Sequence, residues 1–171
     1  MRPAAVAALL IAAGWTSPGV AETSRAFRVG AIIANGCAIS ADAGGGDWGT
    51  IDLGSVDGLG GGSVQASLTT ATAAGLQLDC TPGMTVNLTA DNGGQPLNGV
   101  RQLVHATRPA DRVPYQLFAN GSQTPWTSQA IPLAFAVGTS RLSLPVQARA
   151  VVPRGVVAGR YSDVVRITVT W

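Results

Sequence analysis

The last segment of the sequence, GRYSDVVRITVTW (159–171), alternates hydrophobic and polar residues with a period of two. One face carries four hydrophobic residues: Val165, Ile167, Val169 and Trp171. This alternation predicts a half-buried β-strand. Domains usually finish in a frayed polar tail, whereas this sequence stops on the strand itself. We therefore expect a strand whose far side has no later neighbour from the same chain.

Short alternating segments occupy much of the remaining chain. Hydrophobic residues recur at every second position in GLQLDC (75–80), MTVNLTA (84–90), VPYQLF (113–118), IPLAFAV (131–137) and RLSLPVQARAVV (141–152). Turn sequences such as DNGG, ANGS and TPGM separate them. No window shows a sustained hydrophobic stripe at helical spacing. Short strands at intervals of about ten residues are typical of an antiparallel sandwich or barrel, so we predict one all-β domain.

Three local expectations accompany this pattern. In residues 131–137 the alternation places Val137 on the hydrophobic face with Ile131. The Gly-rich stretch 44–62 predicts loops around one short strand at 48–53. The stretch RQLVHATRPADR (101–112) holds three arginines and the single histidine of the chain. We interpret it as a solvated loop, with recognition of an acidic glycan as the alternative.

The N-terminus has the pattern of a secretory signal. Arg2 supplies a positive charge, a run of ten apolar residues follows at 4–13, and small residues stand at Gly19 and Ala21. Ten apolar residues are too few to cross a hydrocarbon layer about 30 Å thick. We predict a signal peptide at residues 1–21 that is removed on export. Since the other segments are less apolar, we expect no transmembrane segment in the mature chain.

The two cysteines, Cys37 and Cys80, are the whole cysteine content of the chain. In an exported protein two cysteines most simply form one disulfide. Closing a loop of this length stabilises a fold by about 4 kcal/mol in the chain-entropy model. We therefore predict a disulfide between them.

Composition argues against several other functions. Charged residues make up 12% and the formal net charge is +2, so nothing indicates nucleic acid as a partner. The absence of lysine excludes a Walker phosphate loop and a Ser–Lys catalytic pair, and no G-x-S-x-G elbow occurs. Two thiols and one histidine are too few for a metal site. We predict no catalytic residue, no cofactor and no metal.

A second strand pattern lies upstream of the first cysteine. The segment SRAFRVGAII (24–33) has one hydrophobic face: Phe27, Val29, Ala31 and Ile33. One strand is thus surplus at the start, and one is lacking beside the last strand. Either the N-terminal segment folds back into its own domain, or it fills the gap in the next copy by β-strand donation. In the second arrangement each copy binds the next one head to tail. Because such contacts do not close into a ring, they build a fibre.

The free energy of burying this segment shows why the missing strand beside the last one matters. Burying the hydrophobic face of this segment is worth about 5–9 kcal/mol before any hydrogen bonds are counted. Whole domains are stable by only about 5–15 kcal/mol. We therefore expect a subunit without the strand to be marginal, to expose a hydrophobic cleft, and to need a chaperone that lends it a strand.

Four segments in this order resemble the spore coat U domain family: FRVGAIIANGCAIS, LQLDCTPGMTVNLTA, VPYQLFANGSQTPW and the ending AGRYSDVVRITVTW, with its Gly-x-Tyr-x-Asp pattern and final aromatic residue. The resemblance runs over nearly all of residues 25–171. Two positions depart from the family: Trp48-Gly49 stands where Phe-Gly is usual, and Gln147-Ala148-Arg149 stands where Tyr-Gly-Arg is frequent. Neither lies in the first or the last strand pattern.

The resemblance implies a subunit of an archaic chaperone–usher pilus. Its fold would be all-β, an incomplete immunoglobulin-like antiparallel sandwich lacking its last strand, with an N-terminal donor strand. The domains would be a signal peptide at 1–21, a donor segment at 22–34 and the sandwich at 35–171. The chain would pass through the periplasm to a fimbria on the cell surface and support adhesion or biofilm formation.

The resemblance also implies partners and site residues. A periplasmic chaperone would pair with the last strand, and an outer-membrane usher would exchange it for the N-terminal segment of another copy or a related pilin. The implied donor residues are Phe27, Val29, Ala31 and Ile33. The implied acceptor and chaperone-pairing residues are Val165, Ile167, Val169 and Trp171. The alternatives are a self-complemented secreted sandwich, a glycan-binding adhesin module, and a spore or cell-surface coat protein.

Overall fold

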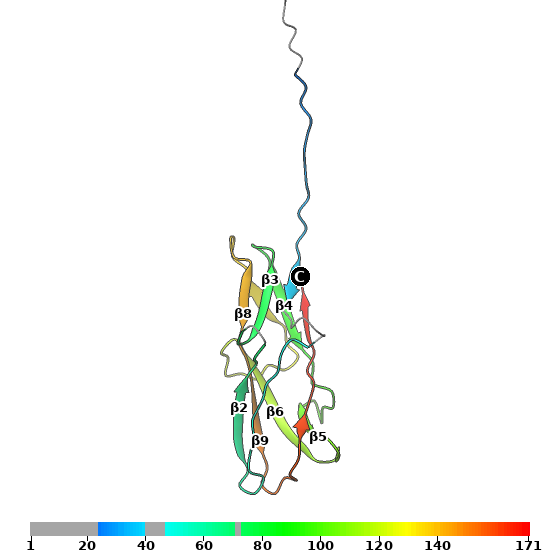
Figure 1. Ribbon diagram of the computed structural model, residues 1–171, viewed down its shortest axis with the longest axis vertical. Helices are drawn as coiled ribbons and strands as arrows, with labels where there is room; N and C mark the ends of the chain where they lie inside the picture. Colours follow the sequence, from blue (N-terminus) through cyan, green and yellow to red (C-terminus); the bar gives the residue numbers. More distant parts are fainter. Residues whose placement is uncertain (1–23, 40–46, 71–72) are drawn as a thin grey trace, which may run out of the picture. The chain divides into compact units, whose positions relative to one another are not determined.

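The computed structural model describes residues 24–39, 47–70 and 73–171 (Figure 1). The described residues form eleven strands: β1 (Cys37–Ile39), β2 (Gly62–Ser67), β3 (Leu76–Cys80), β4 (Thr85–Ala90), β5 (Gln102–His105), β6 (Arg112–Ala119), β7 (Ile131–Ala134), β8 (Arg141–Leu144), β9 (Val146–Val152), β10 (Tyr161–Ser162) and β11 (Ile167–Thr170). The chain divides into two units, Met1–Ile33 and Ala34–Trp171. All of these strands belong to the second unit.

The strands pair antiparallel in three sheets. The largest has the order β10-β5-β6-β9-β2, and the two smaller ones have the orders β1-β3-β8 and β11-β4-β7. Pro145 separates β8 from β9 and marks the point where the chain passes from one sheet to another. A proline is suited to this position because it has no N–H group to donate to a ladder. The predicted all-β, antiparallel architecture is confirmed.

The alternation read from the sequence builds the core. Leu76 and Leu78 of β3 and Val86 and Leu88 of β4 are completely buried, and Leu117 of β6 lies in the same cluster. Because side chains on a strand alternate between its faces, each of these strands contributes every second residue to one common core. The three sheets therefore enclose a single hydrophobic interior.

The connections place β1 and β11 on the same side of β3 and β4. Strand β3 lies between β1 and β8, and β4 lies between β11 and β7. The β7–β8 connection is fastened to the β3–β4 turn, because Gly83 N donates to Phe135 O (2.9 Å) and Cys80 N donates to Ser140 O (2.8 Å). Strands β7 and β8 thus flank the central pair on one side. Strands β1 and β11 flank it on the other.

Three local expectations were wrong or wrong in part. The short strand expected at 48–53 is reduced to one isolated bridge between Thr50 and Thr69. The predicted loops at 44–62 and 101–112 contain the start of β2 and all of β5, respectively. Val137 is 93% exposed, because it belongs to the β7–β8 connection rather than to β7.

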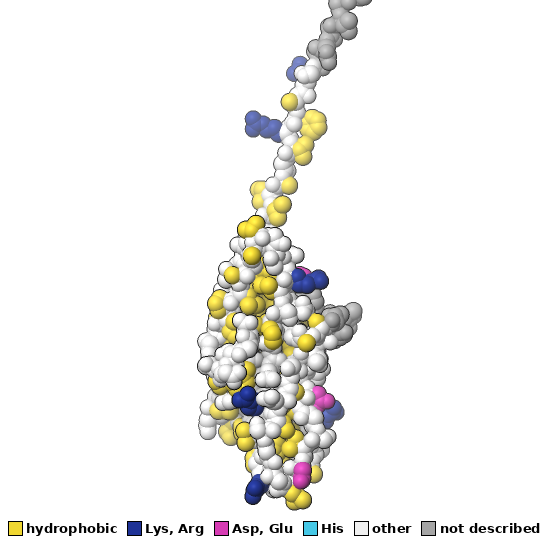
Figure 2. Space-filling model, turned by 90° about the vertical axis from the view of Figure 1, so that its left-hand side faces the viewer, with side chains coloured by type: hydrophobic (Ala, Val, Ile, Leu, Met, Phe, Trp, Pro, Cys, Tyr) yellow, Lys and Arg dark blue, Asp and Glu magenta, His cyan; other side chains and the backbone are white. Residues whose placement is uncertain are grey.

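Charged side chains are sparse on the surface shown in Figure 2, whereas hydrophobic side chains reach it along much of the β-domain. Among the described residues, no helix is long and apolar enough to cross a membrane. The predicted signal peptide, residues 1–21, lies outside the described residues.

Candidate functional site

Strand β11 has a partner on one edge only within the described part of the chain. It pairs with β4 in the register Ile167↔Ala90, Thr168↔Thr89, Val169↔Leu88 and Thr170↔Asn87. It stands at the end of its sheet, and no described strand pairs with its second edge. An open edge of this kind presents a row of unpaired N–H and C=O groups that can pair with another chain.

Burial changes sharply between β4 and β11. The inward side chains of β4, among them Val86 and Leu88, are completely buried. Ile167 and Val169 of β11 pack against the same core but are only half-buried, as is Val165 just before the strand. The difference follows from position, since β4 is flanked by β11 and β7 whereas β11 is flanked by β4 alone. Hydrophobic surface is therefore left uncovered beside the open edge.

We call Val165, Ile167, Val169 and Trp171 the acceptor edge, after the role that the sequence analysis predicts for them. The first three lie on the inner face of one strand, as the sequence alternation predicts. Trp171 follows β11 and remains 61% exposed. The structure thus brings three of these four residues onto the core, and the indole of the fourth is largely exposed.

The predicted disulfide between Cys37 and Cys80 is confirmed. It joins β1 to β3 at the directly opposed pair Cys37↔Cys80. The ladder continues one residue further, because Thr81 N donates to Gly36 O (2.9 Å) and Gly36 N donates to Thr81 Oγ1 (3.0 Å). The chain is thus fixed, covalently and by hydrogen bonds, directly after the N-terminal segment.

The N-terminal segment itself contains no strand in residues 24–36 and is drawn without an arrow in Figure 1. Phe27, Val29 and Ile33 are 86%, 87% and 88% exposed, and Ala31 is exposed as well. Hydrophobic side chains of this size are normally covered in a folded protein. The four residues that share a face by the sequence pattern therefore form no strand and have exposed side chains.

The residues before β11 are held by a carboxylate. Asp163 Oδ2 accepts a hydrogen bond from the Tyr115 hydroxyl of β6 (2.7 Å), and Asp163 Oδ1 accepts one from Gly94 N (2.8 Å). Burial and the bond to Asp163 raise the pKa of Tyr115 well above its ordinary value. The tyrosine therefore stays protonated and remains a donor at neutral pH.

A second fastening joins β11 to the end of β4. Asp91 N donates to Arg166 O (3.0 Å), and Arg166 N donates to Asp91 Oδ1 (3.0 Å). The carbonyl oxygen of Asp91 accepts from Arg101 Nε (2.8 Å) and Nη2 (2.6 Å), and Arg101 Nη1 donates to Trp126 O (2.6 Å). Arg101 is only 4% exposed, and burial lowers the pKa of its guanidinium. These contacts form one polar network, which is buried at Arg101 and partly exposed at Asp91.

The segment 157–161 is fastened through the single histidine. His105 Nδ1 accepts hydrogen bonds from Thr107 N and Arg108 N (3.2 Å each), so Nε2 carries the proton and donates to Ala158 O (3.2 Å). The Tyr161 ring packs edge-on against this imidazole at 5.0 Å. A side chain at Gly159 would collide with the same ring. All polar atoms of the imidazole are thus used within the fold.

These contacts correct the expectation for residues 101–112. Most of this stretch is not a solvated loop, because Arg101 and His105 are buried and β5 follows Arg101 and ends at His105. Arg108 is exposed, but its Nε lies 2.7 Å from Asp111 Oδ2 in an ion pair. The three arginines therefore do not present one shared cationic surface. Their arrangement does not support an acidic-glycan site.

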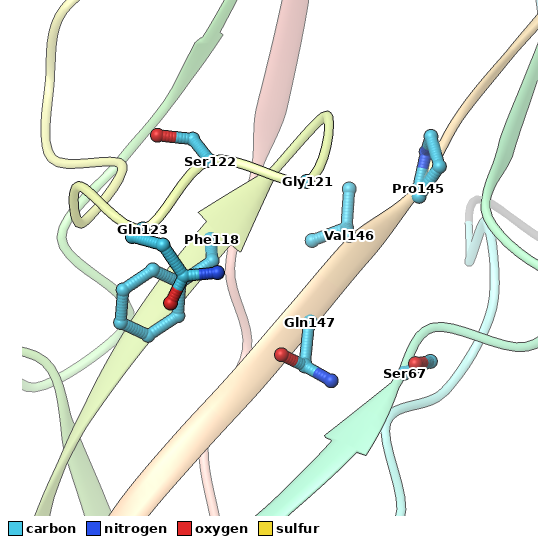
Figure 3. Close-up of a pocket in the computed structure, with 8 residues that line it drawn as sticks. All are labelled: Ser67, Phe118, Gly121, Ser122, Gln123, Pro145, Val146 and Gln147. Carbon is cyan, nitrogen blue, oxygen red and sulfur yellow. The ribbon is translucent and has the colours of Figure 1, made fainter.

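One small cavity of about 150 Å³ has no acceptor-edge residue in its lining (Figure 3). It is formed by the ends of β2 and β6, the turn after β6 and the start of β9; its lining residues are Ser67, Phe118, Gly121, Ser122, Gln123, Pro145, Val146 and Gln147. Pockets for small molecules usually measure about 300–1,000 Å³. Among the described residues, no three His, Cys, Asp or Glu side chains are grouped so that they could hold a metal ion.

Sequence reasoning found the acceptor edge but missed the polar network behind it. The Gly-x-Tyr-x-Asp pattern at 159–163 was the available signal, and each of its defined positions makes a contact that orients the approach to β11. Asp91 gave no such signal, because DNGG reads as an ordinary turn. Arg101 gave no signal either, because the residues beside it have no distinctive pattern.

Three comparisons with known proteins complete the description. The family model for the spore coat protein U domain matches residues 23–168. Among solved structures, the chain is similar to the CsuC–CsuE chaperone–tip adhesion subunit pre-assembly complex from archaic chaperone–usher Csu pili of Acinetobacter baumannii, with a TM-score of 0.51 and 20% identity over 81% of this chain and 40% of that chain. A chaperone–tip adhesin complex of CFA/I fimbriae biogenesis gives a TM-score of 0.48 and 15% identity over 78% of this chain and 41% of that one.

The chain therefore spans about 40% of the length of the first solved chain that it resembles. At 20% identity the first of these likenesses establishes the fold, an immunoglobulin-like antiparallel sandwich. No curated protein matches the sequence.

Proposed function

Because the chain belongs to the spore coat protein U domain family, we propose that it is a structural subunit of a surface pilus, assembled by donation of a β-strand from one subunit to the next. The observation that carries the proposal is a pair of complementary deficits. The acceptor edge has an unpaired backbone and half-buried side chains, and residues 27–33 have an uncovered hydrophobic face. Each supplies what the other lacks.

The ends of β11 indicate the direction of insertion. Gly36 is bonded to Thr81 in the turn that leads into β4, and the C-terminal end of β11 pairs with Asn87 near the start of β4. The donor segment is thus rooted at the same end of the sandwich as Thr170. In a head-to-tail fibre it would reach the next copy from the opposite end, near Val165. We infer that it runs antiparallel to β11, with Ile33 near Val165 and Phe27 near Trp171.

This proposal implies partners and a location. A chaperone in the periplasm would cover the acceptor edge of a new subunit, since an open hydrophobic strand edge is an aggregation site. An outer-membrane usher would then exchange the chaperone for the donor segment, residues 22–34, of another copy or a related pilin. The chaperone–subunit complex among the similar structures supports this assignment. The product would be a fimbria on the cell surface that supports adhesion or biofilm formation, with a structural rather than a catalytic role.

The alternative arrangement is a self-complemented sandwich, in which the same hydrophobic face would be buried in its own domain. The polymerisation test below separates the two arrangements. The roles of the donor residues, the acceptor edge and the domain limits 1–21, 22–34 and 35–171 belong to this proposal.

The test uses two hydrophobic positions in the donor segment that lie on opposite faces of the strand pattern. Phe27 belongs to the proposed inserting face, and Ile32, which is 99% exposed, belongs to the opposite one. We expect Phe27→Asp in the mature chain to abolish polymers while the variant still binds a synthetic peptide of residues 24–34. Ile32→Asp is the matched control and should polymerise like the parent. Size-exclusion chromatography with light scattering measures both.

Two results would contradict the proposal. The first is a parent chain that stays monomeric and folded whether or not residues 22–34 are deleted. The second is equal loss of polymers in both aspartate variants, which would show that no particular face of the segment is recognised.

A further inference from the structure

Before a donor arrives, β11 is weakly held by its own contacts. It is four residues long, it has a ladder on one edge within the described residues, and its inward side chains are half-buried. Strands with few buried contacts open locally at low free energy. A frayed β11 could not offer a straight edge to another strand. Its alignment must therefore depend on contacts beyond its own four residues.

The polar network around Asp91, Arg101 and Asp163 stands where such contacts are needed. Asp163 connects the approach to β11 with Tyr115 of β6 and with Gly94. Asp91 is bonded to both backbone groups of Arg166, immediately before the strand begins. The backbone of Asp91 is held in turn by the buried guanidinium of Arg101. The residues before β11 are thus attached to the end of β4 and to the five-stranded sheet.

The charges make these attachments stiff. Hydrogen bonds to ionised groups are shorter and stronger than neutral ones, and an unpaired charge at a buried position is strongly unfavourable. Arg101 is satisfied by three backbone oxygens, those of Asp91, Trp126 and Thr127. Moving the 163–166 segment would strip partners from Asp163 and Asp91 at once. The network therefore resists displacement of this segment as a unit.

We propose that Asp163 and Asp91 are positioning residues for strand capture: they keep β11 in register on β4 while its second edge is empty. The proposal rests on the function proposed above. The hydrogen bonds of both carboxylates run to the Tyr115 hydroxyl, the Arg166 backbone and the 93–94 turn. They prepare the acceptor edge without contributing to the contacts that the donor makes with it.

The experiment uses the mature chain carrying Phe27→Asp, which leaves the acceptor edge intact and prevents self-polymerisation. The probe is a fluorescent peptide of residues 24–34. Adding Asp163→Asn should weaken peptide binding by about tenfold, the size expected for one charged hydrogen bond. The loss should appear mainly in the association rate. Hydrogen exchange of the amides of 167–170 should be faster in the empty variant, and it should equal that of the parent once peptide is saturating.

Two further variants separate positioning from general stability. Tyr115→Phe removes the donor to Asp163 Oδ2 with little change in shape, and it should give a smaller effect in the same direction should Asp163→Asn fold poorly. Asp79→Asn is the matched control, because its carboxylate pairs with Arg141 Nε at 2.6 Å between β3 and β8, on the far side of the sandwich. It should leave peptide binding and the exchange of 167–170 unchanged.

The outcomes distinguish the two proposals. A background chain that fails to bind the peptide overturns the proposed function, and the positioning role with it. A background chain that binds, together with Asp163→Asn and Tyr115→Phe variants that bind equally fast and protect 167–170 equally well, overturns the positioning role alone. An Asp79→Asn variant that binds as poorly as Asp163→Asn also overturns it, since any lost ion pair would then have the same effect.

Discussion

Residues 24–33 and strand β11 carry the same kind of sequence pattern but differ in the structure. Each has four hydrophobic residues at alternating positions. Strand β11 pairs with β4, and its inward hydrophobic side chains are half-buried. Residues 24–33 form no strand, and their hydrophobic side chains are exposed. Alternation describes a segment that fits a half-buried sheet. Whether it becomes a strand depends on a neighbouring edge, and cross-strand contacts supply the stability.

The two regions differ also in how they are anchored. Asp163 and Asp91 fix the residues before β11 to the rest of the fold, while Gly36 and the Cys37–Cys80 disulfide fix only the C-terminal end of the N-terminal segment. In the proposed assembly the first region receives a strand, and the second region is the strand that is donated. Each of the following changes alters one side of this contrast.

The largest effect is expected from removing the receiving side. Deleting residues 168–171 takes away most of β11 and the uncovered apolar surface beside its open edge. We expect capture by a chaperone to be abolished, because both the ladder and its register are lost. Co-purification of the truncated subunit with a co-expressed periplasmic pilus chaperone that binds the parent subunit measures this. A truncated subunit that is recovered in the same yield as the parent would show that the docking surface lies elsewhere.

The second prediction, of intermediate size, compares the same substitution in two paired strands, β4 and β11. Val86→Ala removes two methyl groups from a completely buried site and should lower the free energy of unfolding by about 2 kcal/mol. Val169→Ala removes the same groups from a half-buried site and should lower it by about 1 kcal/mol. Urea unfolding with and without saturating 24–34 peptide measures both.

The peptide sharpens this second prediction. A donor strand beside β11 would bury Val169 fully, so the effect of Val169→Ala should rise towards that of Val86→Ala, which should itself stay unchanged. If the peptide left both differences as they were, the donor would not cover the inner face of β11.

The strands that the sequence predicted are those whose inward positions hold aliphatic residues. In β3 and β4 every inward residue is hydrophobic, so a period of two is visible without further knowledge. Strand β2 was missed because glycine and serine stand at several of its positions. Strand β5 was missed because the buried residues in and beside it include Arg101, Gln102 and His105, which composition alone assigns to a surface.

The common face of the acceptor edge could be predicted for a similar reason, but the polar network that holds it could not. Val165, Ile167 and Val169 are close in sequence and share one period, so their common face is a local property. The network joins residues 91, 94, 101, 115 and 163, which are brought together only by the sheets. Local patterns do not encode such contacts. The stable protonation of Tyr115 is likewise a consequence of the assembled structure.

The last effect, which is absent at neutral pH, is an alkaline pH dependence confined to the anchored region. Burial and the bond to Asp163 raise the pKa of Tyr115, so the folded state holds this proton more tightly than the unfolded state does. Its contribution to stability is complete below the ordinary tyrosine pKa of about 10 and is lost as the pH rises above it, by about 1.4 kcal/mol per pH unit. Denaturant unfolding between pH 8 and 11 should show this decline in the parent and a weaker one in Tyr115→Phe.

The second tyrosine provides the control for this pH dependence. The pKa of Tyr161 is also raised, chiefly by burial, but its hydroxyl donates to the Val157 carbonyl rather than to a carboxylate. Tyr161→Phe should therefore reduce the alkaline decline less than Tyr115→Phe does. Because no tyrosine lies in residues 24–33, tyrosine ionisation can weaken peptide association only through the chain that receives the peptide. Equal alkaline declines in the two variants would show that the bond between Tyr115 and Asp163 has no special part in holding β11.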